Sequence, residues 1–131
     1  LVEKTAMTAF SLFKNYKPEK AQKIYDNEKK TDKYEEILET YLVKVSSLQL
    51  SDEDSKNVFI LHHAIEDLEK ISDYCEDVLK IKKNIIKKNI AFSDKAKYDL
   101  SVMIAAVTKI VNITVEAFNA NDISKMRDRA A

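Results

Sequence analysis

Apolar residues recur at intervals of three and four positions along most of the chain, the spacing that places them on one face of an α-helix. A first helix is predicted over residues 1–16 and a second over about 18–49, where Pro18 suits the first helical turn. At about 1.5 Å per residue, the second helix would extend roughly 50 Å. Its predicted buried seam consists of Ile24, Thr31, Tyr34, Leu38, Tyr41, Val45 and Leu48.

Two further helices are marked by serine residues that suit the N-cap position. Ser51, followed by three acidic residues, predicts a third helix, with a seam of Leu61, Ile65, Leu68, Cys75, Leu79 and Ile86. Ser93 predicts a fourth helix, with a buried stripe of Leu100, Met103, Val107, Ile110, Thr114 and Ala117. Because the loops are short, neighbouring helices should be antiparallel. The predicted fold class is therefore all-α, an up-and-down antiparallel helical bundle.

The composition excludes several kinds of site. The 131-residue chain contains no glycine, so loops that cradle a phosphate with bare backbone are excluded. Its single cysteine, Cys75, excludes a cysteine-based zinc site, and we expect it to be a small core residue. No stretch without charges approaches the ~20 residues of a spanning helix, so no transmembrane segment is predicted. The chain begins with Leu1 and shows no signal pattern, so we expect that it is cut from a longer protein.

The charges balance overall, with 22 basic and 22 acidic residues, but they are segregated along the chain. Acidic residues dominate residues 51–79, and lysines dominate residues 80–97. A nucleic-acid binder should present a continuous basic surface without an acidic block beside it, so no nucleic-acid partner is predicted. The lysines also suit the end of a long helix, where cations favour the negative end of the macrodipole.

A polar stripe, mostly acidic, runs beside the apolar seam on the second and on the third predicted helix. The two stripes contain Tyr25, Glu28, Asp32, Glu35 and Glu39, and His62, Glu66, Glu69, Asp73 and Glu76. A turn centred between residues 50 and 51 would bring the stripes level, pairing Glu28 with Asp73, Asp32 with Glu69, Glu35 with Glu66, Glu39 with His62 and Tyr25 with Glu76. Facing like charges repel, and a multivalent cation would remove the conflict.

This pairing predicts a metal site made of two Glu-x-x-x-Asp pairs, with the ligands Glu28, Asp32, Glu69 and Asp73. Oxygen ligands favour Mg²⁺, Mn²⁺, Fe or Ca²⁺, and Zn²⁺ is less natural. Auxiliary ligands are expected among Glu35, Glu66, His62 and Glu76. The stripes also fit a plain solvated face, which a chain with 34% charged residues readily forms, so both interpretations stay open.

Catalysis is not expected from this sequence. A ferritin-like di-iron site needs Glu-x-x-His pairs, and neither His62 nor His63 has a glutamate three positions before it. Without glycine the chain also lacks the strained turn that exposes a nucleophilic serine. His63 lies off the polar stripe, so it is a weaker candidate than His62 for a metal ligand.

The sequence resembles the PhoU family at these acidic motifs. Residues 64–73, Ala-Ile-Glu-Asp-Leu-Glu-Lys-Ile-Ser-Asp, are similar to the family signature Asp-Leu-Glu-Arg-Ile-Gly-Asp, and Glu28 to Asp32 is similar to its partner motif. Lys70, Ser72 and Tyr74 depart from the signature, but none of these departures removes a carboxylate. The turn over residues 50–55 resembles the PhoU region of bacterial sodium-dependent phosphate cotransporters.

PhoU proteins are tandem three-helix repeats, and a weak internal similarity places Lys4 with Lys109, Phe13 with Phe118 and Lys20 with Lys125. The resemblance therefore implies a single PhoU-like domain over residues 1–131. Its first repeat would cover about 1–90, and the start of a second repeat about 93–131.

The resemblance implies a non-catalytic cytoplasmic domain that binds a metal ion (Fe, Mn, Mg or Zn) through the acidic motifs and modulates phosphate transport. Its implied partners are a membrane transporter domain of the same polypeptide, which would tether it to the inner face of the membrane, and phosphate-signalling proteins. Apolar surface on the fourth helix, around Ile104, Val111 and Phe118, predicts a homodimer. The alternatives are a helical protein–protein interaction scaffold without metal and a carboxylate metalloenzyme.

Overall fold

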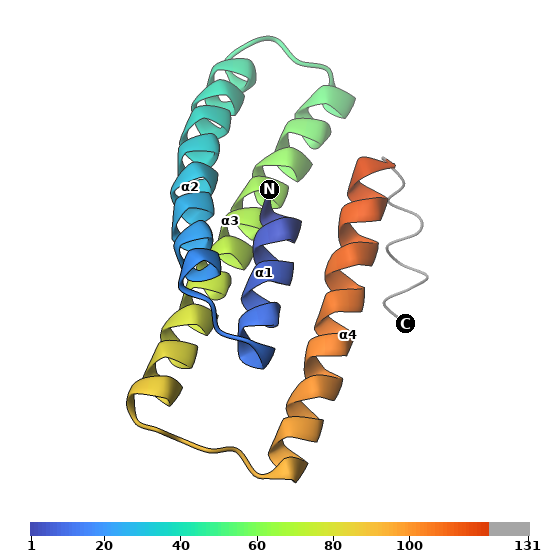
Figure 1. The fold of residues 1–131 in the computed structure, drawn as a ribbon. Coiled ribbons are helices and arrows are strands. Elements are labelled where there is room, and N and C mark those ends of the chain that lie inside the picture. Colours follow the sequence, from blue (N-terminus) through green and yellow to red (C-terminus); the bar gives the residue numbers. More distant parts are fainter. Residues whose placement is uncertain (121–131) are drawn as a thin grey trace. The chain divides into compact units, whose positions relative to one another are not determined.

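The fold is all-α, as predicted. A computed structural model describes residues 1–120, and this part contains four helices and no strand (Figure 1). The helices are α1 (Val2–Lys14), α2 (Pro18–Ser46), α3 (Asp52–Lys87) and α4 (Asp94–Asn119). The part of the predicted second repeat beyond residue 120, including Lys125, lies outside the described residues.

The chain divides into two compact units, Leu1–Lys82 and Lys83–Ala131. The first unit contains α1, α2 and most of α3. Each of these helices runs antiparallel to the one before it in the chain, and a short loop joins α2 to α3 (Figure 1). The described part of the second unit contains the end of α3, a turn and α4. The predicted division into a first repeat that ends near residue 90 and a second repeat that begins near residue 93 stays a prediction.

The helix boundaries follow from capping residues. Pro18 occupies the first turn of α2, where its missing N–H has no helical partner to lose. The Ser51 hydroxyl accepts a hydrogen bond from the Asp54 N–H (3.1 Å), and the Ser93 hydroxyl accepts one from the Ala96 N–H (3.2 Å). These contacts satisfy backbone donors that a helix leaves unpaired at its start. The predicted starts of α3 and α4 are therefore confirmed.

The C-terminal end of α3 shows how a chain without glycine stops a helix. Asn89 adopts a left-handed conformation (φ 51), which asparagine tolerates better than most residues. The N–H of Ile90 donates to the carbonyl of Ile85, and the N–H of Asn89 donates to the carbonyl of Ile86, both at 3.0 Å. This is the Schellman pattern, in which glycine is the commonest residue at the left-handed position.

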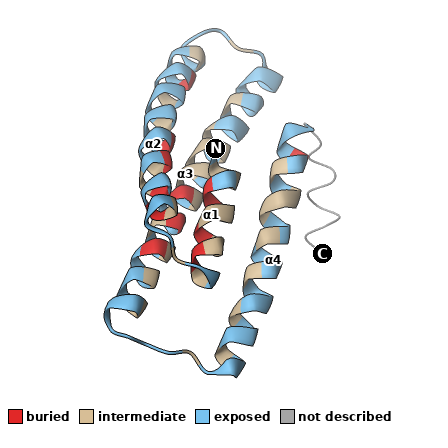
Figure 2. Cartoon of the chain, in the orientation of Figure 1, coloured by how far each residue is buried: buried red, intermediate tan, exposed pale blue. Residues whose placement is uncertain are grey.

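The core of the first unit lies where α1 covers α2 and α3 (Figure 2). Its buried residues are Thr5, Ala6, Ala9 and Leu12 of α1, Ala21, Ile24, Asn27, Thr31 and Leu42 of α2, and Ser72, Cys75 and Leu79 of α3. Many of these side chains are small, which lets helices approach closely. The amide of Asn27 donates a hydrogen bond to the Thr5 hydroxyl across α1 and α2 (3.0 Å), so this buried polar group is satisfied.

A lysine of α3 contacts the C-terminal end of α1. The ammonium group of Lys82 donates to the carbonyl oxygen of Phe13 (3.1 Å) and lies 5.7 Å from the centre of the Phe13 ring, so it caps this end of the helix.

Cys75 is buried as predicted, and burial raises the pKa of its thiol to about 11. Its thiol is therefore uncharged at neutral pH.

The predicted seams are buried only in part. On α2, most of the buried residues lie at or before Thr31, and Leu42 is buried beyond it. Four residues of the seam predicted over residues 18–49 are exposed: Tyr34, Leu38, Tyr41 and Leu48. The reason is length, because α1 has 13 residues and α2 has 29, so α1 covers only the turns nearest their connection. Leu61 and Ile86 of α3 and Met103, Val107 and Ile110 of α4 are also exposed, so the prediction of burial was wrong for them.

One helix of the described residues, α4, is long and apolar enough to cross a membrane by length and composition alone. Its mean hydropathy reaches 1.6 over the best window, since most of its charged residues lie in its first turns and residues 100–117 contain only Lys109 and Glu116. Core helices of soluble proteins pass the same test. The prediction that this chain has no transmembrane segment therefore stays a prediction.

We expect Leu79→Ala to lower the free energy of unfolding of the first unit by about 2–5 kcal/mol, because it leaves a cavity at a fully buried position. Urea denaturation followed by circular dichroism measures this change. Leu48→Ala is the matched control, because Leu48 is 64% exposed and its truncation should cost about 0.5 kcal/mol or less. Equal losses in the two variants would contradict the core described here.

Candidate metal centre

The acidic faces of α2 and α3 meet in the predicted register. The Oε1 atom of Glu39 on α2 lies 2.8 Å from Nδ1 of His62 on α3, and these two residues form one of the predicted level pairs. Glu28 and Asp73, a second predicted pair, also lie close together. Two contacts at separate levels of the antiparallel helices therefore confirm the register.

Three carboxylates form a compact group, which we call the carboxylate cluster: Glu28, Asp32 and Asp73. One oxygen from each residue lies within 4.8 Å of one oxygen from each of the others. Glu28 and Asp32 are four positions apart on α2 and so share a face, and α3 supplies Asp73 from the opposite side. Glu28 is half-buried, whereas Asp32 and Asp73 are exposed.

Glu69, the fourth predicted ligand, is not part of this compact group, but it lies beside it. The pKa of Glu69 is raised, first by partial burial, then by the negative charge of Asp73, and then by the hydrogen bond that a protonated Glu69 would donate to Asp73. The charges of Glu35 and Asp32 raise it further. Glu69 therefore adds a fourth negative charge next to the carboxylate cluster.

Partial burial and repulsion within the carboxylate cluster both raise the pKa of Glu28. Its pKa is raised by partial burial, by the charge of Asp32 and by a hydrogen bond with Asp32, and then by the charges of Glu76 and Asp73. Among residues 1–120, no lysine or arginine forms an ion pair with any of the four predicted ligands. The structure thus brings like charges together without a side-chain cation between them.

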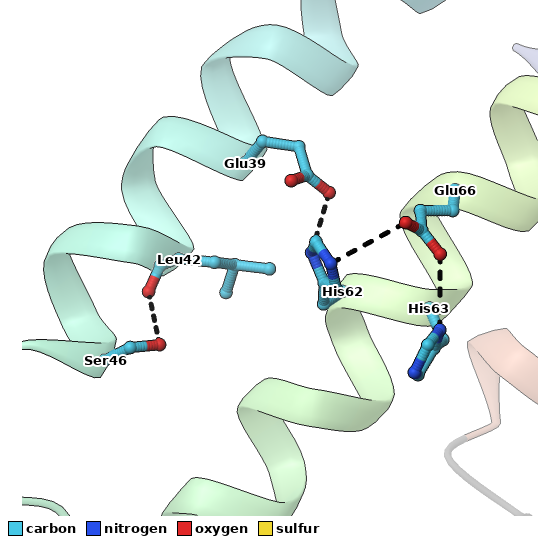
Figure 3. A network of polar contacts seen from close by, with 6 residues as sticks. All are labelled: Glu39, Leu42, Ser46, His62, His63 and Glu66. Atoms are coloured by element: carbon cyan, nitrogen blue, oxygen red, sulfur yellow. Dashed lines mark hydrogen bonds and ion pairs between the residues drawn. The ribbon is translucent and has the colours of Figure 1, made fainter.

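The predicted auxiliary ligands fall into two places. Glu35 and Glu76 border the carboxylate cluster, where their charges raise the pKa values of Glu69 and Glu28. Glu76 already has a cationic neighbour, since its carboxylate lies 2.9 Å from the ammonium group of Lys80. His62 and Glu66 lie farther along the helices, next to Glu39 (Figure 3). They cannot be ligands of the same ion as Glu28.

One polar contact was missed by sequence reasoning. His63 lies off the acidic stripe, yet its Nδ1 is 3.2 Å from Oε2 of Glu66, and its ring packs edge-on against Phe59 at 4.4 Å between centres. The spacing of three residues between His63 and Glu66 is the signal that could have predicted this contact.

The chemistry of the carboxylate cluster suits a hard cation. All its donors are carboxylate oxygens, they come from two helices, and two of the three residues are open to solvent, so water could complete the coordination. The pKa of Glu28 is raised first by partial burial and then by the negative charges of its neighbours. A divalent or trivalent ion would convert this repulsion into coordination, so the residues fit a metal ion.

Comparison with known proteins identifies a family for most of the chain. The PhoU domain family matches residues 1–81, which include α1, α2, most of α3 and all four predicted ligands. No curated protein and no solved structure matches the chain. The match covers more than half of the chain and coincides with the first compact unit.

The raised pKa of Glu28 predicts how metal-free stability depends on pH. Folded Glu28 holds its proton more tightly than unfolded Glu28, so the folded state binds more protons and stability falls as pH rises. This loss of stability begins near pH 4.5, the ordinary pKa of glutamate, and is complete above the raised pKa of Glu28 in the folded state. The pH range between these two values is the window in which stability changes.

We therefore expect Glu28→Gln to be more stable than wild type in chelator, with the difference absent at low pH and complete above this window. Urea midpoints measured at a series of pH values test the expectation. Glu36→Gln removes a charge from an exposed position of the same helix and serves as control. If the urea midpoints of Glu28→Gln and wild type differ by the same amount at every pH, the pKa of Glu28 is not raised in the folded state and this expectation is wrong.

Proposed function

Because the chain belongs to the PhoU domain family, a regulatory family of phosphate transport without catalytic activity, we propose that it is the cytoplasmic regulatory domain of a sodium/phosphate cotransporter. In this proposal it binds a metal ion through its acidic motifs and modulates phosphate transport. A transporter domain of the same polypeptide would hold it at the inner face of the membrane. Phosphate-signalling proteins and a second copy of the chain are the further partners that we propose.

The observation that supports the metal role is the carboxylate cluster, which lies within the matched residues. Glu28, Asp32 and Asp73 would hold the ion, and Glu69 would add a fourth oxygen ligand from α3. Iron, manganese and magnesium suit these oxygen donors, and zinc is a less natural choice. The ion would supply positive charge, and the chain's own residues would orient the carboxylates and keep the two helices in register.

Metal binding can act on function through the hairpin of α2 and α3. A ligand shifts a conformational equilibrium only by its different affinity for the two states. Here the ion would bind only when α2 and α3 are in register, because Asp73 lies on a different helix from Glu28 and Asp32. Loss of the ion would therefore loosen the hairpin whose far half carries exposed Tyr34, Leu38 and Tyr41.

A second candidate function is a helical interaction scaffold that binds no metal. The observation in its favour is the number of large apolar side chains exposed on α2, α3 and α4, since contiguous exposed apolar surface usually marks a contact with another molecule. In this case the acidic stripe would only keep the protein soluble. The two functions differ in their response to metal.

Metal should stabilise the wild-type chain and not the double variant Asp32→Asn/Asp73→Asn. Binding to the folded state alone adds about 2.7 kcal/mol when free metal is one hundred times Kd. In chelator the double variant should melt higher than wild type, because it lacks two of the repelling charges. Thermal melts with chelator, Mn²⁺ or Fe²⁺ measure both effects.

The matched control is Glu36→Gln/Asp67→Asn, which also removes one charge from α2 and one from α3, at exposed positions outside the carboxylate cluster. It should respond to metal as wild type does. Melting curves of wild type and Asp32→Asn/Asp73→Asn that coincide with and without metal would reject the metal site and leave the scaffold as the better account.

The transport role is tested by phosphate uptake in cells that express the full polypeptide containing this chain. We expect Asp32→Asn/Asp73→Asn to change the uptake rate, by about twofold or more, at phosphate concentrations where wild-type uptake is restrained. The control Glu36→Gln/Asp67→Asn should leave uptake at the wild-type rate. Uptake that is unchanged in both variants, at equal protein levels, would reject a regulatory role for the carboxylate cluster.

A further inference from the structure

A second polar group lies on the acidic face near the α2–α3 loop, and we call it the histidine group: Glu39, His62, His63 and Glu66 (Figure 3). The ring of His62 lies between two carboxylates from different helices. Its Nδ1 is 2.8 Å from Oε1 of Glu39 on α2, and its Nε2 is 3.7 Å from Oε1 of Glu66 on α3. The other oxygen of Glu66, Oε2, is 3.2 Å from Nδ1 of His63.

The histidine group is separate from the carboxylate cluster. Glu28 and Glu39 lie on the same helix, and at about 1.5 Å per residue they are roughly 16 Å apart along its axis. A single ion with ligand distances of about 2 Å cannot reach both residues. Ligand binding at one place can therefore be lost without loss at the other.

The buried oxygen of Glu39 lacks a well-placed hydrogen bond. Oε1 of Glu39 is shielded from solvent and has no hydrogen-bond partner of good geometry among the described residues. Its close contact is the nitrogen of His62, which is positively charged only when the ring is protonated. In residues 1–120, no lysine or arginine forms an ion pair with Glu39 or Glu66. A buried carboxylate oxygen needs a counter-charge, and the side chains around it supply only an imidazole.

The separation of the two ligand atoms suits a shared metal ion. An ion bound at about 2.0–2.2 Å to a nitrogen and to an oxygen places these two atoms roughly 3 Å apart when the ligands are adjacent. Nδ1 of His62 and Oε1 of Glu39 are 2.8 Å apart. An imidazole ligand also favours zinc and other first-row transition metals over magnesium and calcium.

The rest of the histidine group would orient the ring of His62. A histidine that binds metal through one nitrogen usually directs the other nitrogen towards a carboxylate, which fixes the ring. Glu66 lies on the Nε2 side of His62, and His63 holds the second oxygen of Glu66. Glu66 is therefore a positioning residue, whereas His62 and Glu39 are the two direct ligands.

From these contacts we propose that Glu39 and His62 form a second metal site, selective for a transition metal ion such as Zn²⁺, with water at the remaining positions. The site joins α2 to α3 at the end of the hairpin opposite the carboxylate cluster. It does not depend on the metal role proposed for Glu28, Asp32 and Asp73, and the two roles can fail separately.

The experiment follows the ring nitrogens of both histidines by NMR in ¹⁵N-labelled full-length chain during titration with ZnCl₂ and, separately, with MgCl₂. We expect Zn²⁺ to shift the Nδ1 signal of His62 much more than either nitrogen of His63, and Mg²⁺ to leave the His62 ring unchanged. The measurement uses wild-type protein, so it does not depend on whether any variant folds.

Variants then assign the ligands. Glu39→Gln and Glu66→Gln should each weaken Zn²⁺ binding by about tenfold or more, and His62→Gln should abolish the site. Asp32→Asn/Asp73→Asn should keep the Zn²⁺ shift at His62, which separates this site from the carboxylate cluster. His63→Gln should keep the Nδ1 shift at His62, because His63 reaches the site only through Glu66.

Three results would each overturn the proposal. The first is a His62 ring that responds to pH but not to Zn²⁺, which would make the contact with Glu39 a simple ion pair. The second is a Zn²⁺ shift centred on His63. The third is a Zn²⁺ shift at His62 that disappears in Asp32→Asn/Asp73→Asn, which would make it a secondary effect of metal in the carboxylate cluster.

Discussion

The register of α2 against α3 is the constraint on which both the core and the acidic face depend. With 3.6 residues per turn, the helix rotation that directs Ile24 and Leu79 into the core also directs Glu28 and Asp73 towards each other beside it. Apolar burial favours this register, and electrostatics oppose it. The free energy of packing therefore holds together carboxylates that would separate on their own.

Such a conflict between local charge and global packing is informative. Sequences tend to be consistent at every level, from propensity to packing, and exceptions concentrate where a protein binds something. Solvated acidic faces are common, but here partial burial and neighbouring charges raise the pKa values of two glutamates on facing helices. The acidic face of this hairpin is thus more constrained than a surface that merely keeps a protein in solution.

The sequence predicted the helices and the register well because both depend on local signals. Capping by Ser51 and Ser93 and the position of Pro18 set the helix starts, and the short turn after α2 set which residues are level. The carboxylate cluster followed from spacing alone, apart from the exact place of Glu69.

Burial was harder to predict, because periodicity identifies the apolar face of a helix but not the length of its neighbour. Tyr34 and Leu38 continue the face that carries Ile24, yet α1 is too short to cover them. His63 was missed for a related reason. Its link to the acidic face runs through the side chain of Glu66, and side-chain reach is not encoded in a stripe of positions.

The buried thiol of Cys75 gives the first unit an internal reporter. It is buried on α3, and with a pKa of about 11 it remains protonated and shielded while the helices of the unit stay packed. Alkylating reagents react with exposed thiolate, so modification of Cys75 requires the helices to part. The rate of Cys75 alkylation therefore reports how often the helices of the first unit separate. It requires no added label, because no other cysteine in the chain competes for the reagent.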